Sequence, residues 1–135
     1  MRILLLTYIF SLLCVLFSIQ NKSMNQSIED GSIIYNDFCI QCHGPLGRGL
    51  NENIPPLDDA DFLLNTNRSI SIIKYGAKGP IIVNNKEYIG NSMISQGLDD
   101  EEVSDVLNYI KNSWNNSDKS QVTIEDVINI KNPQS

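Results

Sequence analysis

The sequence predicts a mostly α-helical domain, and three observations support this prediction. Residues 99–114 combine a helix-start signal with an apolar stripe at helical spacing. Residues 28–39 have a roughly helical periodicity, residues 67–76 are long enough for a short helix, and only residues 80–90 are typical of strands. With 135 residues, of which 41% are apolar and 19% charged, the chain can form one modest core.

The N-terminal segment, residues 1–23, differs in kind from the rest. Arg2 precedes an apolar run from Ile3 to Ile19, which is typical of a secretory signal. The run is slightly short for a membrane span of roughly 20 residues, and no clear small-residue cleavage site follows it. We therefore expect a periplasmic or exported protein, with two fates for this segment. It is either cleaved between Ser18 and Ser23 or retained, with residues 3–19 as an inner-membrane anchor.

The remaining chain divides into a folded domain, residues 24–119, and a C-terminal tail with a short helix, residues 120–135. From residue 24 onward there are 8 basic residues (the 10 of the whole chain less Arg2 and Lys22) against 16 acidic ones, a net charge of −8. This balance argues against nucleic acid as a partner, because phosphate binding needs basic residues. Contact with a membrane is expected only if the N-terminal segment is retained.

The first helix of the domain is expected from Ile28 to Cys39. Ser27 and Asp30 have the spacing of a capping box at its start, and apolar residues recur at roughly helical intervals. The stretch that follows, residues 44–62, is rich in Gly, Pro, Asn and Asp, which predicts an irregular loop.

A short helix over residues 67–76 and a hairpin over residues 80–90 come next. Gly76 is a plausible C-terminal stop for the helix. Asn84 and Asn85 separate the two apolar-rich halves of the hairpin, and asparagine tolerates the positive φ angles that such a turn requires.

The strongest helix begins after Asp99, which is a good N-cap with Glu102 three residues later. A last short helix is expected to begin at Thr123, where Asp126 repeats this spacing after the linker "NNSDKSQ". One face of the stronger helix is expected to be buried, and its residues are Val103, Val106, Leu107, Ile110 and Trp114.

The segment "CIQCH" holds Cys39, Cys42 and the sole histidine, His43. In C-x-x-C-H, two thiols are spaced to add to the vinyl groups of a haem while the adjacent imidazole reaches the iron. A thioredoxin-type dithiol would need a βαβ context, and a structural zinc site would need four ligands. A disulfide remains possible in an oxidising compartment, although it would close so small a loop that it would stabilise the fold little.

A haem iron bound by His43 has room for a second axial ligand. No other histidine exists, so this position is either open or taken by a methionine. Met1 lies in the leader and Met24 precedes the first expected helix, which leaves Met93 in the polar loop "GNSMISQG". The alternative for Met93 is a core-filling role, but the loop around it has no apolar stripe.

From about Gly31 to Trp114 the sequence resembles a class I, mitochondrial-like monohaem c-type cytochrome of the exported bacterial type. The matching features are an aromatic-bearing helix before "CIQCHG", a Gly/Pro loop with "PPL", the methionine loop and the capped terminal helix. This resemblance implies the cytochrome c fold, with about four to five short helices around one haem and a small hairpin insertion.

The resemblance also implies roles for single residues. Cys39 and Cys42 would form thioethers to one covalent haem c. His43 and Met93 would be the proximal and distal iron ligands. Pro55, with Pro56 as the alternative, would accept the ring N–H of the histidine through its carbonyl.

Further roles follow from the same resemblance. Gly31 and Tyr35 would meet the terminal helix near Tyr109, although Gly31 is equally explained as a glycine near a helix start. Arg48 would pair with a haem propionate, or would simply be a solvated loop arginine.

The implied function is one-electron transfer, from a periplasmic dehydrogenase or respiratory complex to an oxidase. The chain would be a carrier and not an enzyme, because its only histidine is committed to the iron. "GPIIVNNKEYIGNSM" resembles an insertion in cytochromes associated with quinoprotein sugar or alcohol dehydrogenases. The loop "SMISQG" lacks the prolines of many relatives, which would weaken Met93 ligation. The alternative function is therefore small-ligand binding or sensing by a haem with a labile Met93.

Overall fold

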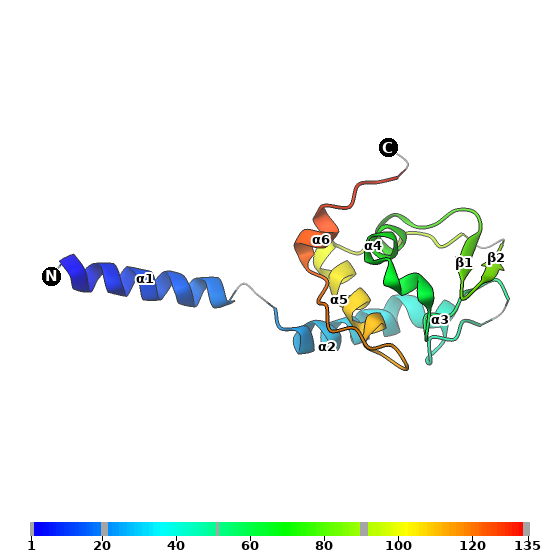
Figure 1. Ribbon diagram of the computed structural model, residues 1–135, viewed down its shortest axis with the longest axis horizontal. Helices are drawn as coiled ribbons and strands as arrows, with labels where there is room; N and C mark the ends of the chain where they lie inside the picture. Colours follow the sequence, from blue (N-terminus) through cyan, green and yellow to red (C-terminus); the bar gives the residue numbers. More distant parts are fainter. Residues whose placement is uncertain (1, 20–21, 51, 90–91, 134–135) are drawn as a thin grey trace.

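The computed structural model describes residues 2–19, 22–50, 52–89 and 92–133, excluding the side chains of residues 2–4 and 14–19. Helix α1 (Arg2–Ile19) extends away from the other elements (Figure 1), and its described apolar side chains, such as that of Phe10, are mostly exposed. Within the described ranges, no helix has both the length and the apolar character needed to cross a membrane.

The first helix of the domain, α2 (Met24–Ile34), begins four residues earlier than the sequence predicts. Ser23 is its N-cap and accepts a hydrogen bond from the amide of Gln26 at 3.2 Å. The predicted capping role of Ser27 is wrong, because its hydroxyl donates to the Asp105 carboxylate at 2.6 Å instead. The helix continues as a π-helical turn, η1 (Tyr35–Cys39), and then as α3 (Ile40–His43).

The middle of the chain contains a 3-10 turn, η2 (Asp61–Leu64), and helix α4 (Thr66–Tyr75). Gly76 ends α4 with a φ angle of 81°, which confirms the predicted stop. The predicted hairpin is also confirmed: β1 (Ile81–Val83) pairs antiparallel with β2 (Lys86–Tyr88).

The hairpin turn is anchored to η2. Asn84 and Asn85 have φ angles of 52° and 61°, as a turn of this kind requires. The Asn84 side chain accepts from the amide of Asp61 at 2.9 Å, and the Asp61 carboxylate accepts from the amide of Asn84 at 2.7 Å. This reciprocal pair fixes where the hairpin sits relative to η2.

Helix α5 (Asp100–Lys111) has the predicted capping box between Asp99 and Glu102. It ends at Lys111 and not at Trp114, because the backbone leaves the helix and Trp114 has a φ angle of 57°. Helix α6 (Ile124–Ile128) follows with a second capping box. The buried apolar residues form the core: Tyr35, Ala60, Leu63, Ile70, Val83, Val103, Val106, Leu107, Ile110, Val122 and Val127.

Helices α2 and α5 cross in direct contact, as the sequence predicts. A Cβ atom on Gly31 would collide with the Asp105 carbonyl oxygen and would lie 2.9 Å from the Cβ of Tyr109. The ring of Tyr35 packs on that of Tyr109 with centroids 5.4 Å apart. Glycine is therefore required at this crossing of α2 and α5.

Candidate haem-binding site

A cavity of about 270 Å³ lies between α3, the loops that follow it, α4, the hairpin and α5. Cys39, Cys42, His43 and Met93 all line it. The two thiols and the imidazole come from the continuous helical stretch that ends in α3, whereas Met93 comes from the loop after β2. The structure thus brings together, around one cavity, the four residues that the sequence predicts to hold a haem.

The C-x-x-C-H segment is held at its end by one buried and one exposed hydrogen bond. The Tyr35 hydroxyl donates to the carbonyl of Gly44 at 2.7 Å, and Gly44 has a φ angle of 76° that lets the chain leave α3 sharply. The indole N–H of Trp114 donates to the carbonyl of Pro45 at 3.1 Å. The π-helical turn η1 lies immediately before these residues, and such turns are frequent at functional sites.

The imidazole of His43 is oriented by a neighbouring carbonyl. Its Nδ1 lies 3.2 Å from the carbonyl oxygen of Pro55. Burial lowers the pKa of His43 and outweighs the opposing effect of the Pro55 carbonyl. A neutral ring that donates Nδ1–H to Pro55 leaves Nε2 as the free, basic nitrogen, which is the form that ligates a metal.

Pro55 is brought to His43 by the loop that follows α3. The Gly49 amide donates to the His43 carbonyl at 2.9 Å, and a Cβ atom on Gly49 would collide with the carbonyl of Ile54. Gly49 also has a φ angle of 74°, so both its conformation and its contacts exclude a side chain.

Cys39 and Cys42 are free thiols, the first half-buried and the second exposed. Burial, with a smaller contribution from Cys42, raises the pKa of Cys39 to about 11. A catalytic dithiol needs a thiol pKa well below the ordinary value, so this environment disfavours the thioredoxin-type alternative. Across the described residues, no three Cys, His, Asp or Glu side chains cluster as the ligands of a metal ion would.

Met93 is held through its backbone. Its carbonyl accepts a hydrogen bond from the amide of Ala77 at 2.8 Å, and the two residues form an isolated β-bridge. Gly76 allows this close approach, because a Cβ atom there would lie only 2.6 Å from the Met93 carbonyl oxygen. The C-terminal end of α4 therefore fixes the position of the methionine loop.

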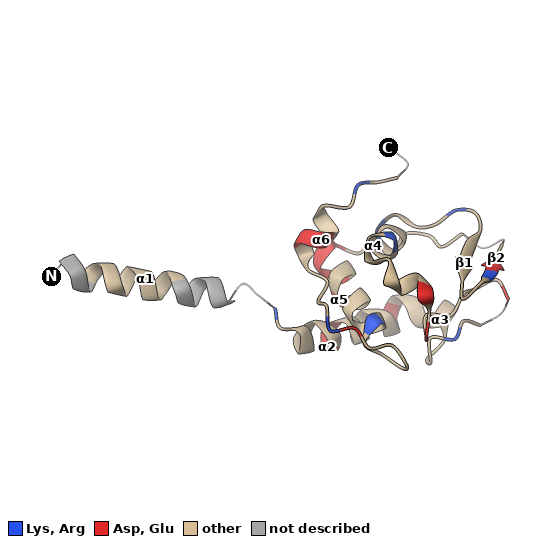
Figure 2. Cartoon of the chain, in the orientation of Figure 1, with Lys and Arg blue, Asp and Glu red and all other residues tan. Residues whose placement is uncertain are grey.

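Of the described side chains that line the cavity, the two thiols and the imidazole are the ones that can ionise. Among the described residues that line it there is no Asp, Glu, Lys or Arg. Figure 2 shows charged positions on other parts of the domain, among them α4, α5 and α6. Two thiols and an imidazole at the edge of a mainly apolar cavity fit a covalently attached haem, whose large ring needs apolar neighbours.

Arg48 does not line the cavity. Its Nε lies 3.8 Å from the carboxylate of Asp58, and its side chain is 71% exposed. The pairing of Arg48 with a haem propionate therefore stays a prediction.

Several lining residues were not singled out from the sequence. Phe62 in η2 and Gln96 in the methionine loop are examples. Their position at the cavity depends on the tertiary fold. The apolar character of residues in η2, α4 and β1 is only a weak sequence signal that they line a cavity. The apolar lining residues in these elements are Phe62, Leu63, Ile72, Ile73, Ile81 and Val83.

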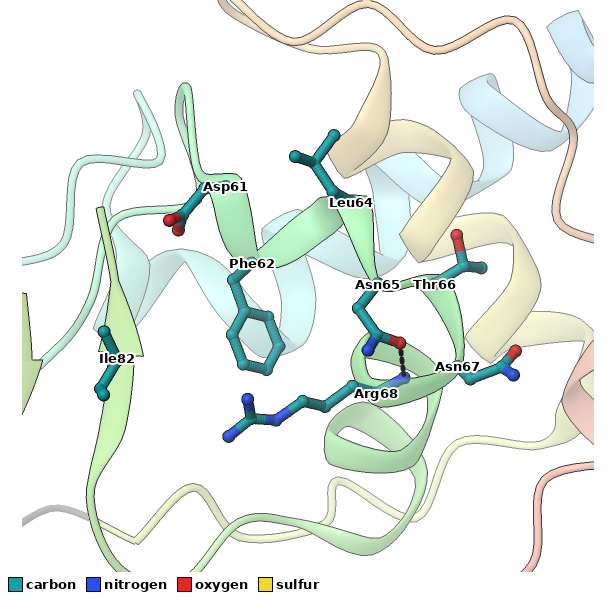
Figure 3. Close-up of a pocket in the computed structure, with 8 residues that line it drawn as sticks. All are labelled: Asp61, Phe62, Leu64, Asn65, Thr66, Asn67, Arg68 and Ile82. Carbon is teal, nitrogen blue, oxygen red and sulfur yellow. Dashed lines mark hydrogen bonds between the residues drawn. The ribbon is translucent and has the colours of Figure 1, made fainter. Parts of the chain in front are cut away.

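A second, more open hollow of about 600 Å³ lies beside this cavity and shares Phe62 with it. Figure 3 shows Asp61, Asn65 and Arg68 around it, with the Asn65 side chain capping α4. The Arg68 guanidinium lies 4.8 Å from the centre of the Phe62 ring. None of the cysteine, histidine or methionine residues discussed above lines this hollow.

Comparison with known proteins agrees with the geometry. The sequence model of the cytochrome c family matches residues 28–114. The gluconate 2-dehydrogenase cytochrome c subunit of Pantoea cypripedii is 27% identical over 106 residues, which are 76% of this chain and 24% of that protein. Cytochrome c subunits of quinone alcohol dehydrogenases are similar at 26% identity, in Komagataeibacter europaeus over 81% of this chain and in Gluconobacter oxydans over 72%.

The chain spans about a quarter or less of the length of these relatives, 24% in the first two and 21% in the third. The family match, by contrast, covers more than half of the chain and contains Cys39, Cys42 and His43. The family's cofactor is a haem c bound covalently through such a cysteine pair. The chain belongs to the cytochrome c family.

Proposed function

We propose that the protein is a one-electron carrier whose haem iron is ligated by His43 and Met93. The observation that carries this proposal is that both residues line the same apolar cavity as the two thiols. A haem bound in this way supplies a metal centre that gains or loses one electron. The chain provides the thioether and imidazole ligands.

The surroundings of His43 support a carrier rather than a catalyst. The imidazole is already committed through Nδ1 to the Pro55 carbonyl and is free only through Nε2. No carboxylate or basic side chain among the described lining residues is available for general acid–base chemistry. Hydrogen bonds to Gly44 and Pro45 hold the chain just after His43 in place, which favours a small reorganisation when the iron changes oxidation state.

We further propose that the electron donor is a dehydrogenase and that the acceptor is an oxidase, both outside the cytoplasm. The similarity to cytochrome c subunits of gluconate and alcohol dehydrogenases supports the donor. The apolar leader, residues 3–19, supports export, where covalent haem attachment and oxidase partners are expected.

The alternative, a haem that binds small ligands after losing Met93, requires a loose methionine loop. The hydrogen bonds of Met93 and Ser95 to the end of α4 favour retention of the ligand. We therefore prefer electron transfer to small-ligand sensing as the function of this protein.

A potentiometric titration of the holoprotein tests the proposal. We expect a single reversible one-electron wave, and a fall in midpoint potential in Met93→Ala, because the soft thioether favours reduced iron. Met24→Ala is the matched control, since Met24 does not line the cavity, and it should leave the potential unchanged. A high-spin ferric wild type that binds carbon monoxide rapidly on reduction would overturn the proposal in favour of ligand binding.

A further inference from the structure

The described part of the C-terminal tail, residues 120–133, lies outside the family match but is packed into the domain. Val122 and Val127 are 3% and 0% exposed. The Asn108 side chain fastens the tail to α5, because it accepts from the amide of Val122 at 2.8 Å and donates to its carbonyl at 2.9 Å. The tail is thus a fixed part of the structure.

The tail also binds the C-terminal end of α4. The Lys74 ammonium donates to the carbonyl of Val127 at 3.1 Å, and the Tyr75 hydroxyl donates to the carbonyl of Ile130 at 2.8 Å. Lys74 is held in place by Asp100 of α5, whose carboxylate lies 2.6 Å away. Figure 1 shows α6 and the chain that follows it running beside α4.

The same C-terminal end of α4 also holds the methionine loop. The Ala77 amide donates to the Met93 carbonyl, and the Ser95 hydroxyl donates to the Lys74 carbonyl, both at 2.8 Å. Residues 74 to 77 therefore connect the tail to the loop within four positions of the chain.

The described part of the methionine loop, residues 92–97, has few other anchors. It contains no proline, and Ile94 is 71% exposed. The described residues of this loop, 92–97, include neither a proline nor a buried apolar side chain. Their position depends on a few hydrogen bonds, so whatever steadies the partner of these bonds on α4 also steadies the loop.

We propose that the tail braces the methionine ligand, with Tyr75 as a positioning residue that acts through the end of α4. This inference rests on the proposed ligation by Met93. When Tyr75 loses its bond to Ile130, the end of α4 is freer to move, Met93 leaves the iron more often, and external ligands gain access.

Imidazole binding to the oxidised holoprotein tests this, because imidazole competes with Met93 and its apparent affinity scales with the fraction of open sites. We expect Tyr75→Phe to bind imidazole about fivefold more tightly, as the loss of one hydrogen bond implies. A chain that ends at Asn129 should show the same increase in imidazole affinity. Introducing Tyr75→Phe into that shortened chain should increase the affinity little further. The controls are Tyr88→Phe on β2 and a chain that ends at Lys131, which keeps the Ile130 carbonyl.

The thermal midpoint is measured on the same samples. If Tyr75→Phe and the Asn129 chain lower this midpoint without changing the imidazole affinity, the tail only stabilises the fold and the proposal is overturned. An equal increase in imidazole affinity in the two controls would also overturn the proposal. If the wild type itself has no sulfur-to-iron charge-transfer band, Met93 is not a ligand, and the proposed function fails before the brace is tested.

Discussion

The Nζ atom of Lys22 lies 2.6 Å from a carboxylate oxygen of Asp105, whose side chain is only 4% exposed. Asp30 and Glu101 approach the same ammonium, at 2.7 Å and 3.0 Å. Hydrogen bonds from Ser27 and Lys22 satisfy the Asp105 carboxylate at the crossing of α2 and α5. A residue that the sequence assigns to the leader segment thus belongs, by its contacts, to the folded domain.

Lys22→Ala should destabilise the protein. The buried Asp105 carboxylate would lose its cation and keep only the Ser27 hydroxyl, which predicts a loss of about 1–3 kcal/mol in the free energy of unfolding. Urea unfolding of the holoprotein measures this change. Lys119→Ala, at an exposed position just before the tail, is the control and should reduce the free energy of unfolding far less. Equal stability of the two variants would refute the role of Lys22.

The same ion pairs predict a pH dependence. Burial opposes the charge on Lys22, but the hydrogen bonds to Asp105, Asp30 and Glu101 outweigh it and raise the pKa of Lys22 above its ordinary value of 10.5. Its contribution is therefore complete below pH 10.5 and lost as the pH rises through the raised value. The bond to Lys22 lowers the pKa of Asp30 below its ordinary 3.8, so the contribution of Asp30 is present above pH 3.8 and lost as the pH falls through the lowered value.

The stability difference between the wild type and Lys22→Ala should accordingly be constant at intermediate pH and shrink at both extremes. Unfolding curves recorded from pH ~3 to ~11 check the constant region and the beginning of the decrease at each end. A difference that is unchanged at acid pH would show that Asp30 is not coupled to Lys22.

The position of Lys22 also constrains processing of the leader. If the leader is removed, cleavage should occur before Lys22, because removal of Lys22 would leave Asp105 without its cation. Intact-mass and N-terminal sequencing of the exported holoprotein would locate the first residue. A mature chain that starts at Ser23 or later would contradict this expectation.

Gly31→Ala should disrupt the crossing of α2 and α5. The added methyl group meets the backbone carbonyl of Asp105, which cannot move aside as a flexible side chain could. We expect a loss of at least about 2 kcal/mol in the free energy of unfolding. Asn25→Ala on the exposed part of α2 is the control, and a comparable loss in both variants would mean that the crossing is not the cause.

The elements that the sequence predicted correctly have local signals. The capping residues Asp99 and Thr123 and the turn residues Asn84 and Asn85 act within four positions of themselves. The start of α2 was misplaced because Ser23 and Ser27 can both cap a helix. The choice between them depends on Asp105, 78 positions beyond Ser27.

The site residues also divide into those placed by local sequence signals and those placed by contacts between distant parts of the chain. Cys39, Cys42 and His43 form a contiguous motif, so their proximity to one another follows from the sequence alone. The approach of the Pro55 carbonyl to His43 depends on the loop folding back at Gly49. Helical periodicity extends to Trp114, but the backbone leaves the helix first, and the Trp114 ring packs against Tyr35 at 5.3 Å between centroids.

The most direct test of the account is the absorption spectrum of the oxidised holoprotein in the region of the sulfur-to-iron charge-transfer band. Ligation by His43 and Met93 predicts that the wild type and Met24→Ala have this band and that Met93→Ala lacks it. If the wild type lacks the band, or if Met93→Ala retains it, Met93 does not bind the iron and the account of the site is wrong.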